Sequence, residues 1–227
     1  EYVDEMLSRS KDILALPPVV QIILGVTAGK SSSASDVASL IENDPALVNG
    51  VLALVNSPYF GFAKKISSLS HAVAVLGFQE VQNIVLSISV VGLFEQRGYD
   101  FMERIWKHSF CVGAATRMVA GYLKLKTENK YFVAGLLHDI GRIFLSQFLG
   151  VKFREMLSLF EQDDGRITYH ALEDAFFGIS HAQIGGKLME SWGFSMDIMD
   201  AVTFHHEPSC ARVNKALAAC VHVADLI

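Results

Sequence analysis

The sequence has 227 residues, of which 51% are hydrophobic, and this is enough to bury a packed core in one large domain or two small ones. Such a composition excludes an intrinsically disordered chain. The formal net charge of −5 at pH 7 gives no overall positive field, and the sequence contains no basic run. We therefore expect no nucleic-acid partner.

Cysteine usage and apolar stretches indicate a cytoplasmic protein. The three cysteines form no C-x-x-C pair, which is typical of reduced thiols. The longest apolar stretch, 84–94, is interrupted by Ser87 and Ser89 and is shorter than the ~20 residues of a membrane span, so we expect a buried helix and no membrane partner. No signal peptide opens the sequence. The helical pattern of 216–227 continues to the last residue, so we expect a longer chain.

Helical spacing recurs along the chain, whereas sustained alternation of apolar and polar residues is absent. The sequence therefore predicts an all-α fold. The first predicted helix follows Asp36, because Val37, Leu40 and Ile41 lie on one face of a helix.

Two further helical segments follow in the first half of the chain. Asp44 followed by Pro45 predicts an N-cap and a first-turn proline, and Asn-Ser-Pro at 56–58 predicts the end of that helix. Ser70 precedes the helical segment "HAVAVLGF", and helical spacing continues through Ile88.

Charge and glycine interrupt the apolar pattern at "EQRGYD", 95–100, which predicts a boundary between two subdomains. We assign 1–98 to an N-terminal helical subdomain and 99–227 to a second helical subdomain. Helices are predicted in the second subdomain at 101–123, 129–149, 151–162, 168–177, 180–191, 195–206 and 211–227.

Two doublets of metal-binding side chains stand out in the second subdomain. His138 and Asp139 are adjacent within "GLLHDIGRI", and on a helix they would point about 100° apart, so they would flank a cleft and not share one core face. His205 and His206 repeat this arrangement at the end of "DAVTFHH". Doublets of this kind are uncommon in a core and favour a functional site. For the other isolated histidines, at 71, 170 and 222, we expect core or capping roles.

His108, His181 and Asp225 are further candidates, each on a separate predicted helix. Imidazoles and carboxylates without a thiolate suit iron, manganese or catalytic zinc better than a structural zinc site. Such a set could serve two cations about 3.5–4 Å apart, the separation used in two-metal hydrolysis of phosphate esters.

The segments "IWKHSFCVGAA", "AGLLHDIGR", "GISHAQIGGK", "AVTFHHEP" and "VHVADLI" resemble the HD superfamily of metal-dependent phosphohydrolases. The earlier segments "IENDPALVNGVLALVNSPYFG" and "ISSLSHAVAVLGFQEVQNIVLS" resemble the N-terminal half of an HDOD domain, a bacterial signalling module related to HD-GYP phosphodiesterases. The resemblance covers 16–227 and implies an N-terminal helical subdomain packed on an HD-type helical bundle.

The resemblance also implies a metal site, since every ligand position of the superfamily is retained. The implied cofactor is one or two divalent metal ions, with iron or manganese favoured over zinc or nickel. The implied ligands are His108, His138, Asp139, His181, His205, His206 and Asp225.

Two departures from the related families affect the expected chemistry. The Gly-Tyr-Pro segment of HD-GYP proteins is missing after "HHE", which makes cyclic di-GMP a less favoured substrate. The lysine that often follows His-Asp-x-Gly is replaced by Arg142, which could bind a phosphate or serve only as a cation at a helix end. We expect Glu173 to be solvated or to support a ligand.

Two classes of function remain open. The first is a regulatory module whose helical surfaces contact signalling proteins or adjacent domains of a longer chain. The second is a metal-dependent phosphodiesterase or phosphohydrolase acting on a nucleotide or cyclic dinucleotide, with Asp139 and Arg142 as catalytic residues. The HDOD-like first half favours regulation.

Overall fold

The computed structural model describes residues 41–42, 44–58, 60–95, 100–126, 130–163 and 167–227. Within these segments it contains helices and no strand, which confirms the all-α prediction. Its helices are α4 (Pro45–Val55), α5 (Leu69–Leu76), α6 (Phe78–Glu95), α7 (Asp100–Tyr122), α8 (Lys130–Leu137), α9 (Ile140–Phe148), α10 (Gly150–Gln162), α11 (Tyr169–Phe177), α12 (His181–Ser191), α13 (Met196–Thr203), the 3-10 helix η1 (Pro208–Cys210) and α14 (Lys215–Asp225). The first predicted helix lies outside the described residues except for Ile41 and Glu42, which are helical.

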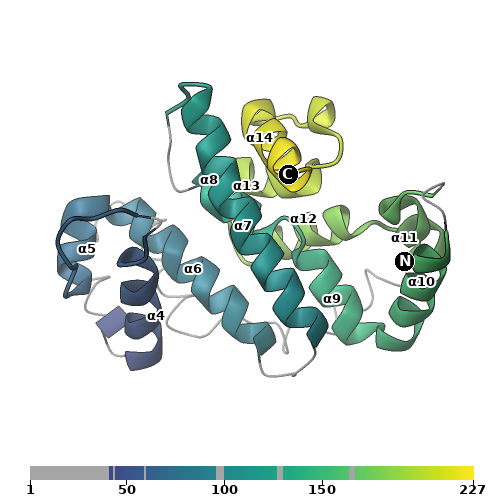
Figure 1. The fold of residues 1–227 in the computed structure, drawn as a ribbon, viewed down its shortest axis with the longest axis horizontal. Helices are drawn as coiled ribbons and strands as arrows, with labels where there is room; N and C mark the ends of the chain where they lie inside the picture. Colours follow the sequence, from purple (N-terminus) through teal and green to yellow (C-terminus); the bar gives the residue numbers. More distant parts are fainter. Residues whose placement is uncertain (1–40, 43, 59, 96–99, 127–129, 164–166) are drawn as a thin grey trace.

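The helices form an elongated molecule (Figure 1). Helices α4, α5 and α6 lie at one end, α7 crosses the middle, and α10 and α11 lie at the other end. Helix α7 packs on α8 and α14, while α12 packs on α9 and α13. This arrangement confirms the prediction of an N-terminal helical subdomain packed on a helical bundle.

Local capping signals begin the N-terminal helices. Asp44 accepts hydrogen bonds from the backbone N–H groups of Ala46 and Leu47, both at 3.1 Å, so the predicted N-cap is confirmed. The cap of α5 was predicted wrongly. Ser68, and not Ser70, accepts a hydrogen bond from the His71 N–H at 3.1 Å, because its extended backbone places the hydroxyl beneath the first turn.

Helix α6 joins the two hydrophobic cores of the molecule. Its residues Val81, Ile84 and Val85 belong to the core that α4 and α5 build. Leu86 and Val90 belong to the larger core of the C-terminal helices. The buried helix predicted for the apolar stretch therefore connects both halves, and the subdomain boundary placed after it stays a prediction.

The two serines that interrupt this apolar stretch are buried with their hydroxyl groups hydrogen-bonded inside the helix. Ser87 donates a hydrogen bond to the Asn83 carbonyl, and Ser89 donates one to the Val85 carbonyl, both at 2.8 Å. Each hydroxyl is satisfied within the helix, so the buried face carries no unpaired donor at either position.

Three predicted helices of the C-terminal half differ from those observed, and the one predicted at 211–227 runs only from Lys215 to Asp225. The helix predicted at 129–149 is divided into α8 and α9 by His138 and Asp139. The helix predicted at 195–206 ends at Thr203, so His205 and His206 lie in the turn that follows it. At both doublets the first histidine donates a side-chain hydrogen bond to a backbone carbonyl of the preceding turn, which competes with continued helix.

Helix α12 approaches its neighbours closely because glycines face it or belong to it. A Cβ atom at Gly141 of α9 would lie 2.0 Å from the His181 carbonyl oxygen, and one at Gly186 would lie 2.0 Å from Oγ1 of Thr203. Hydrogen in place of a methyl group therefore lets α9 and α13 approach α12 from two sides. This contact brings the start of α12 beside both doublets.

No single helix in the described part of the chain is long and apolar enough to cross a membrane. One pair, Lys130–Phe148 with Gly150–Gln162, reaches the required length and apolar composition but bends by 117° at its break.

Replacing Gly141 with alanine should lower the free energy of unfolding by ~1–3 kcal/mol, because the added methyl group would overlap the backbone of His181. Chemical denaturation measures the change. Gly92→Ala is the matched control, since a Cβ atom there meets nothing within 4 Å and alanine favours a helix. We expect the control to be as stable as the original protein or slightly more so. A Gly141→Ala protein of unchanged stability would contradict the close contact of α9 with α12.

Candidate metal centre

The seven side chains predicted as ligands come together in one cluster. They project from α7, from the break between α8 and α9, from the start of α12, from the turn after α13 and from the end of α14. Their ligand atoms form three overlapping groups, each with all its atoms within 4.8 Å of one another. These groups are His181, His205 and His206; His108, His138 and Asp225; and His138, Asp139 and His205.

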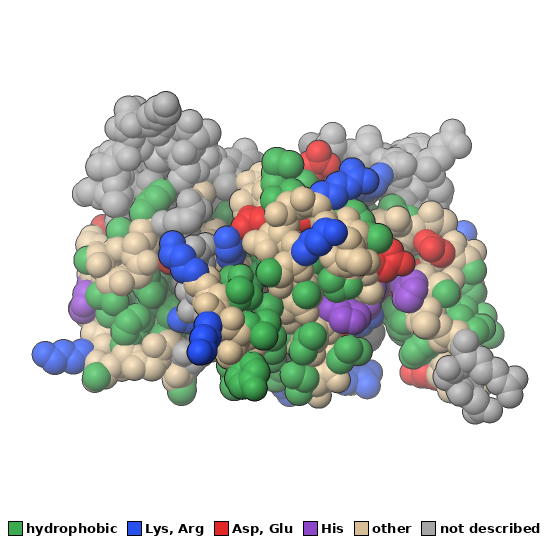
Figure 2. Space-filling view, turned by 90° about the horizontal axis from the view of Figure 1, so that it is seen from above, with side chains coloured by type: hydrophobic (Ala, Val, Ile, Leu, Met, Phe, Trp, Pro, Cys, Tyr) green, Lys and Arg blue, Asp and Glu red, His purple; other side chains and the backbone are tan. Residues whose placement is uncertain are grey.

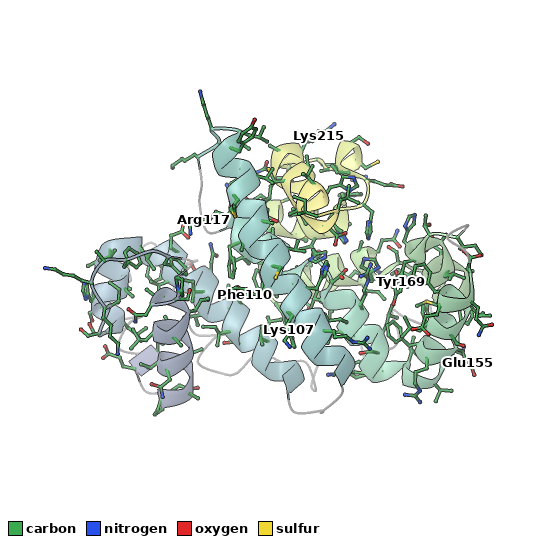
Figure 3. All side chains as sticks on the ribbon, in the orientation of Figure 1. Lys107, Phe110, Arg117, Glu155, Tyr169 and Lys215 are labelled. Atoms are coloured by element: carbon green, nitrogen blue, oxygen red, sulfur yellow. The ribbon has the colours of Figure 1, made fainter. Side chains whose placement is uncertain are left out.

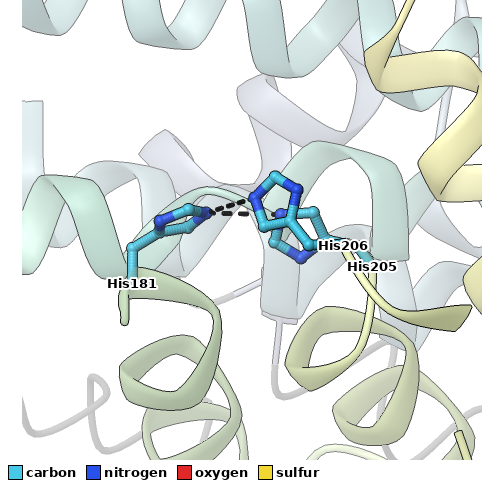
Figure 4. Close-up of side chains that lie close together, drawn as sticks. All are labelled: His181, His205 and His206. Carbon is cyan, nitrogen blue, oxygen red and sulfur yellow. Dashed lines mark hydrogen bonds between the residues drawn. The ribbon is translucent and has the colours of Figure 1, made fainter. Parts of the chain in front are cut away.

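The first group consists of three imidazoles (Figure 4). Nε2 of His181 lies 3.3 Å from Nε2 of His205 and 3.0 Å from Nε2 of His206. His181 and His205 are fully buried, while His206 is partly exposed. Three ring nitrogens from two separate segments thus face one small volume.

The second group lies where α7 meets α14. Nε2 of His108 is 3.0 Å from Oδ1 of Asp225, and Nε2 of His138 is 3.2 Å from the same oxygen. The side chain of His108 is 42% exposed and that of Asp225 is 15% exposed, whereas His138 is buried. The centre is therefore accessible from this side. Figure 2 shows histidine side chains at the surface of the C-terminal half.

Asp139 lies between the two groups. Its Oδ1 is 3.3 Å from Nε2 of His181, while its Oδ2 is 3.5 Å from Nε2 of His138 and 4.0 Å from Nε2 of His108. The side chain is 1% exposed, and Oδ1 has no hydrogen-bond partner among the described residues. A buried carboxylate oxygen without a donor is costly, and a cation at this position would remove the cost.

In two of the buried imidazoles, a hydrogen bond from Nδ1 fixes the orientation of the ring and so of its Nε2 atom. Nδ1 of His138 lies 2.7 Å from the Gly135 carbonyl, and Nδ1 of His205 lies 2.7 Å from the Val202 carbonyl. A carbonyl only accepts, so both Nδ1 atoms carry the proton. The Nε2 atoms of the neutral rings then present lone pairs to the centre, as metal ligands do.

Glu173 fixes His181 in the same way. Its Oε2 accepts hydrogen bonds from Nδ1 of His181 at 2.5 Å and from the backbone N–H of His181 at 2.8 Å. Nε2 of His181 and Nε2 of His205 therefore face each other without a proton between them when both rings are neutral. Two opposed lone pairs repel, and the contact is favourable only with a cation nearby.

The electrostatic environment keeps both carboxylates of the centre ionised. Burial alone would raise the pKa of Asp139, but the Arg142 guanidinium and the neighbouring imidazoles hold it well below its usual range. The pKa of Asp225 is likewise low, because hydrogen bonds from His108 and His138 outweigh burial. Both side chains are charged at neutral pH and could serve as metal ligands.

Three imidazoles of the centre differ in the direction of their pKa shifts. Burial and neighbouring imidazoles hold the pKa of His205 well below 6.5, and they lower the pKa of His206 to about 4. Burial also lowers the pKa of His138, but Asp139 and Asp225 outweigh it and the result lies above 6.5. His205 and His206 are neutral at neutral pH, whereas His138 keeps its second proton to a higher pH than a free imidazole does, so a metal ion bound there would compete with that proton.

Arg142 lies in the first turn of α9, so its interpretation as a cation at the end of a helix is wrong. Its Nη1 donates to Oδ2 of Asp139 at 2.6 Å, and its guanidinium lies 4.4 Å from the centre of the Tyr169 ring. Figure 3 shows Tyr169 at the start of α11, beside α9. The charge of Arg142 is thus directed at the predicted ligand carboxylate.

Residues around the candidate ligands complete the centre, and the sequence indicated the role of Glu173 in part. Glu173 is fully buried, so the expectation of a solvated side chain is wrong and its supporting role fits the contacts. The His170 ring stacks on His206 with 5.5 Å between ring centres. Nδ1 of His222 donates to the carbonyl of His205 at 2.7 Å, which holds the turn carrying the doublet. Tyr169 carried no signal, because a tyrosine at a helix start is ordinary.

Solved bacterial proteins have a fold similar to that of this chain. A solved HDOD domain protein of unknown function from Geobacter sulfurreducens is 27% identical, with a TM-score of 0.76, over 99% of this chain and 78% of that chain. A candidate phosphohydrolase from Shewanella amazonensis SB2B is 24% identical with a TM-score of 0.81, over 97% of this chain and 78% of that chain, and this likeness shows the fold. Both support the HD-type bundle predicted from the sequence.

A curated relative from Treponema pallidum (strain Nichols), described as an uncharacterized protein, is 29% identical over 225 residues. The match covers 96% of this chain but 42% of the relative, so the chain spans less than half of that protein's length. The family model of the HDOD domain matches residues 13–208, which leaves Asp225 beyond the matched segment and associated with the centre by its contacts. The match includes both halves of the molecule, and the chain therefore belongs to the HDOD domain family.

Proposed function

We propose that this HDOD domain is a regulatory module that binds a divalent metal ion in its HD-type centre. The observation that carries the proposal is the set of ring nitrogens and carboxylate oxygens that face inward around Asp139. The Nδ1 protons of His138, His181 and His205 are all bonded outward, and Oδ1 of Asp139 has no hydrogen-bond partner among the described residues. Such an arrangement is unfavourable without a cation and favourable with one.

The donor atoms suit one or two divalent ions. The residues that would hold them are His108, His138, Asp139, His181, His205, His206 and Asp225. Imidazole nitrogens with carboxylate oxygens favour iron or manganese, with zinc or nickel as alternatives. Glu173 would raise the basicity of His181 as a ligand, because it accepts the proton on the opposite ring nitrogen.

Helix α7 offers a physical route from the metal centre to the N-terminal helices. His108 contributes to the centre, while Arg117, farther along α7, places its guanidinium 5.7 Å from the centre of the Phe60 ring in the N-terminal half. Figure 3 labels Arg117 on this helix. A cation that ties α7 to α8, α12 and α14 would restrict their relative movement. The proposed readers of that change are signalling proteins or adjacent domains of a longer cytoplasmic protein.

Hydrolysis of a phosphodiester or nucleotide is the second candidate function, and the position of Arg142 favours it. The guanidinium adjoins the centre and can bind two phosphoryl oxygens, while Asp139 would hold the metal. Exposure of His108 leaves a side of the centre open to a ligand. A divalent ion, when bound, would supply Lewis acidity to the reaction.

Asp139→Ala should abolish metal uptake, because it removes the carboxylate that faces both groups of imidazoles. The test is metal analysis of protein purified without chelator, together with thermal melting before and after addition of manganese. We expect the original protein to be stabilised by ~2.7 kcal/mol at a metal concentration 100 times the Kd, and the variant not at all.

Glu155→Ala is the control for this substitution, since Glu155 is exposed on α10, away from the centre (Figure 3). It should bind metal as the original protein does. An Asp139→Ala protein with unchanged metal content and an unchanged metal-dependent melting shift would refute the proposed site.

Metal affinity should rise with pH through neutrality, because the metal ion must displace the proton on His138. Since the pKa of His138 is raised above 6.5, this proton is present below the raised pKa and is lost only above it. The lowered pKa values of His205 and His206 leave no proton there to displace. We expect about a tenfold gain per pH unit until the His138 proton is gone, measured by manganese titration. A constant affinity from about pH 6.5 to about pH 8 would contradict this assignment.

The hydrolytic candidate predicts turnover of an aryl phosphodiester or of a small nucleotide panel by protein loaded with manganese or ferrous iron. His138→Ala is the comparison, because it removes a buried ligand. Loaded protein that does not exceed this variant on any substrate would eliminate hydrolysis and leave the regulatory function.

A further inference from the structure

The two halves of the metal centre differ in one respect that bears on how many cations it holds. Oδ1 of Asp139 faces His181, and no cationic side chain contacts that oxygen in the described part of the chain. Oδ2 faces His138 and His108, and Nη1 of Arg142 lies 2.6 Å from it. A protein cation therefore already occupies the oxygen that the second half of the centre would use.

The net charge of the centre also favours one bound divalent ion over two. Asp139, Glu173 and Asp225 contribute three carboxylates to the centre, and Arg142 contributes one guanidinium. With neutral imidazoles these groups leave two negative charges, which one divalent ion neutralises. A second divalent ion would leave two excess positive charges in a largely buried site, a costly state unless an anion enters.

The contacts of Arg142 are incomplete, which makes its displacement feasible. Its Nε–H is buried without a hydrogen-bond partner among the described residues, and its guanidinium lies over the ring of Tyr169. Burial raises the pKa of Tyr169, so this neighbour is a neutral phenol at neutral pH. A phosphoryl group accepts several N–H donors of one guanidinium, and so offers Arg142 more bonds than its present position provides.

We propose that Arg142 is an internal counter-ion that competes with a second metal ion for Oδ2 of Asp139. A phosphoryl anion that draws the guanidinium away couples ligand binding to occupancy of the second metal position. The protein then holds one metal ion in the absence of such an anion and two in its presence. This inference rests on the proposed metal site and assigns a regulatory part to Arg142 within it.

Manganese binding to Arg142→Met tests the competition directly. Equilibrium dialysis with metal analysis gives the number of ions bound, and electron paramagnetic resonance reports coupling between two adjacent ions. We expect the original protein to bind one ion tightly and a second weakly. In the variant the second ion should bind at least about tenfold more tightly, within the range of typical coupling between two sites.

Inorganic phosphate supplies the second arm of the experiment. In the original protein phosphate should raise the affinity for the second ion, and in Arg142→Met its effect should be smaller because no guanidinium has to be displaced. Arg142→Lys keeps the charge and should resemble the original protein without phosphate. Arg154→Met is the control for loss of an arginine, since Arg154 is exposed on α10.

The outcomes separate this inference from the proposed function. An original protein that takes up no manganese overturns both. If the original protein takes up manganese but Arg142→Met binds the second ion with unchanged or lower affinity, only the proposed competition is overturned. Should the variant fail to fold, the phosphate arm on the original protein decides, and a second-ion affinity that is independent of phosphate overturns the inference.

Discussion

The burial of one ionised carboxylate, Asp139, is the constraint on which the rest of the C-terminal half depends. A buried charge without partners costs several kcal/mol, so its neighbours must compensate it. Arg142 supplies one hydrogen bond and the imidazoles of His138 and His181 supply the rest of the electrostatic environment. These groups come from separate helices, and the fold must bring those helices to one point before the carboxylate is stable there.

The chain meets this constraint by interrupting helices where the ligands lie. Nδ1 of His138 bonds to the Gly135 carbonyl, a group that continued helix would require, and the helix restarts at Ile140. The result is that His138 and Asp139 turn toward the same centre, although on an unbroken helix they would diverge by about 100°. The turn after Thr203 does the same for His205 and His206, where Nδ1 of His205 bonds to the Val202 carbonyl.

Much of the fold could be predicted from the sequence, since apolar spacing and caps such as Asp44 act over a few residues. The two doublets could be singled out too, because adjacent metal-binding side chains are unusual in a core, and the structure brings them into one cluster. The contact of His170 could not be predicted, and for Glu173 the sequence left a solvated and a supporting role open. Their significance arises from contacts with His181 and His206, and nothing within one helical turn of either residue specifies a partner on another helix.

The regulatory and hydrolytic functions differ less in their residues than in what occupies Oδ2 of Asp139. With Arg142 on that oxygen, a single divalent ion beside Oδ1 would balance the charge of the centre, and the α7 and α14 side, with His108 and Asp225, would lack a bound ion. With Arg142 on a phosphoryl group, the same oxygen is free and the charge of a second ion is offset by the anion. On the proposals above, this HDOD domain would respond to a phosphorylated ligand without turning it over, because a second ion beside His108 and Asp225 would add α7 and α14 to the helices that the metal centre holds together.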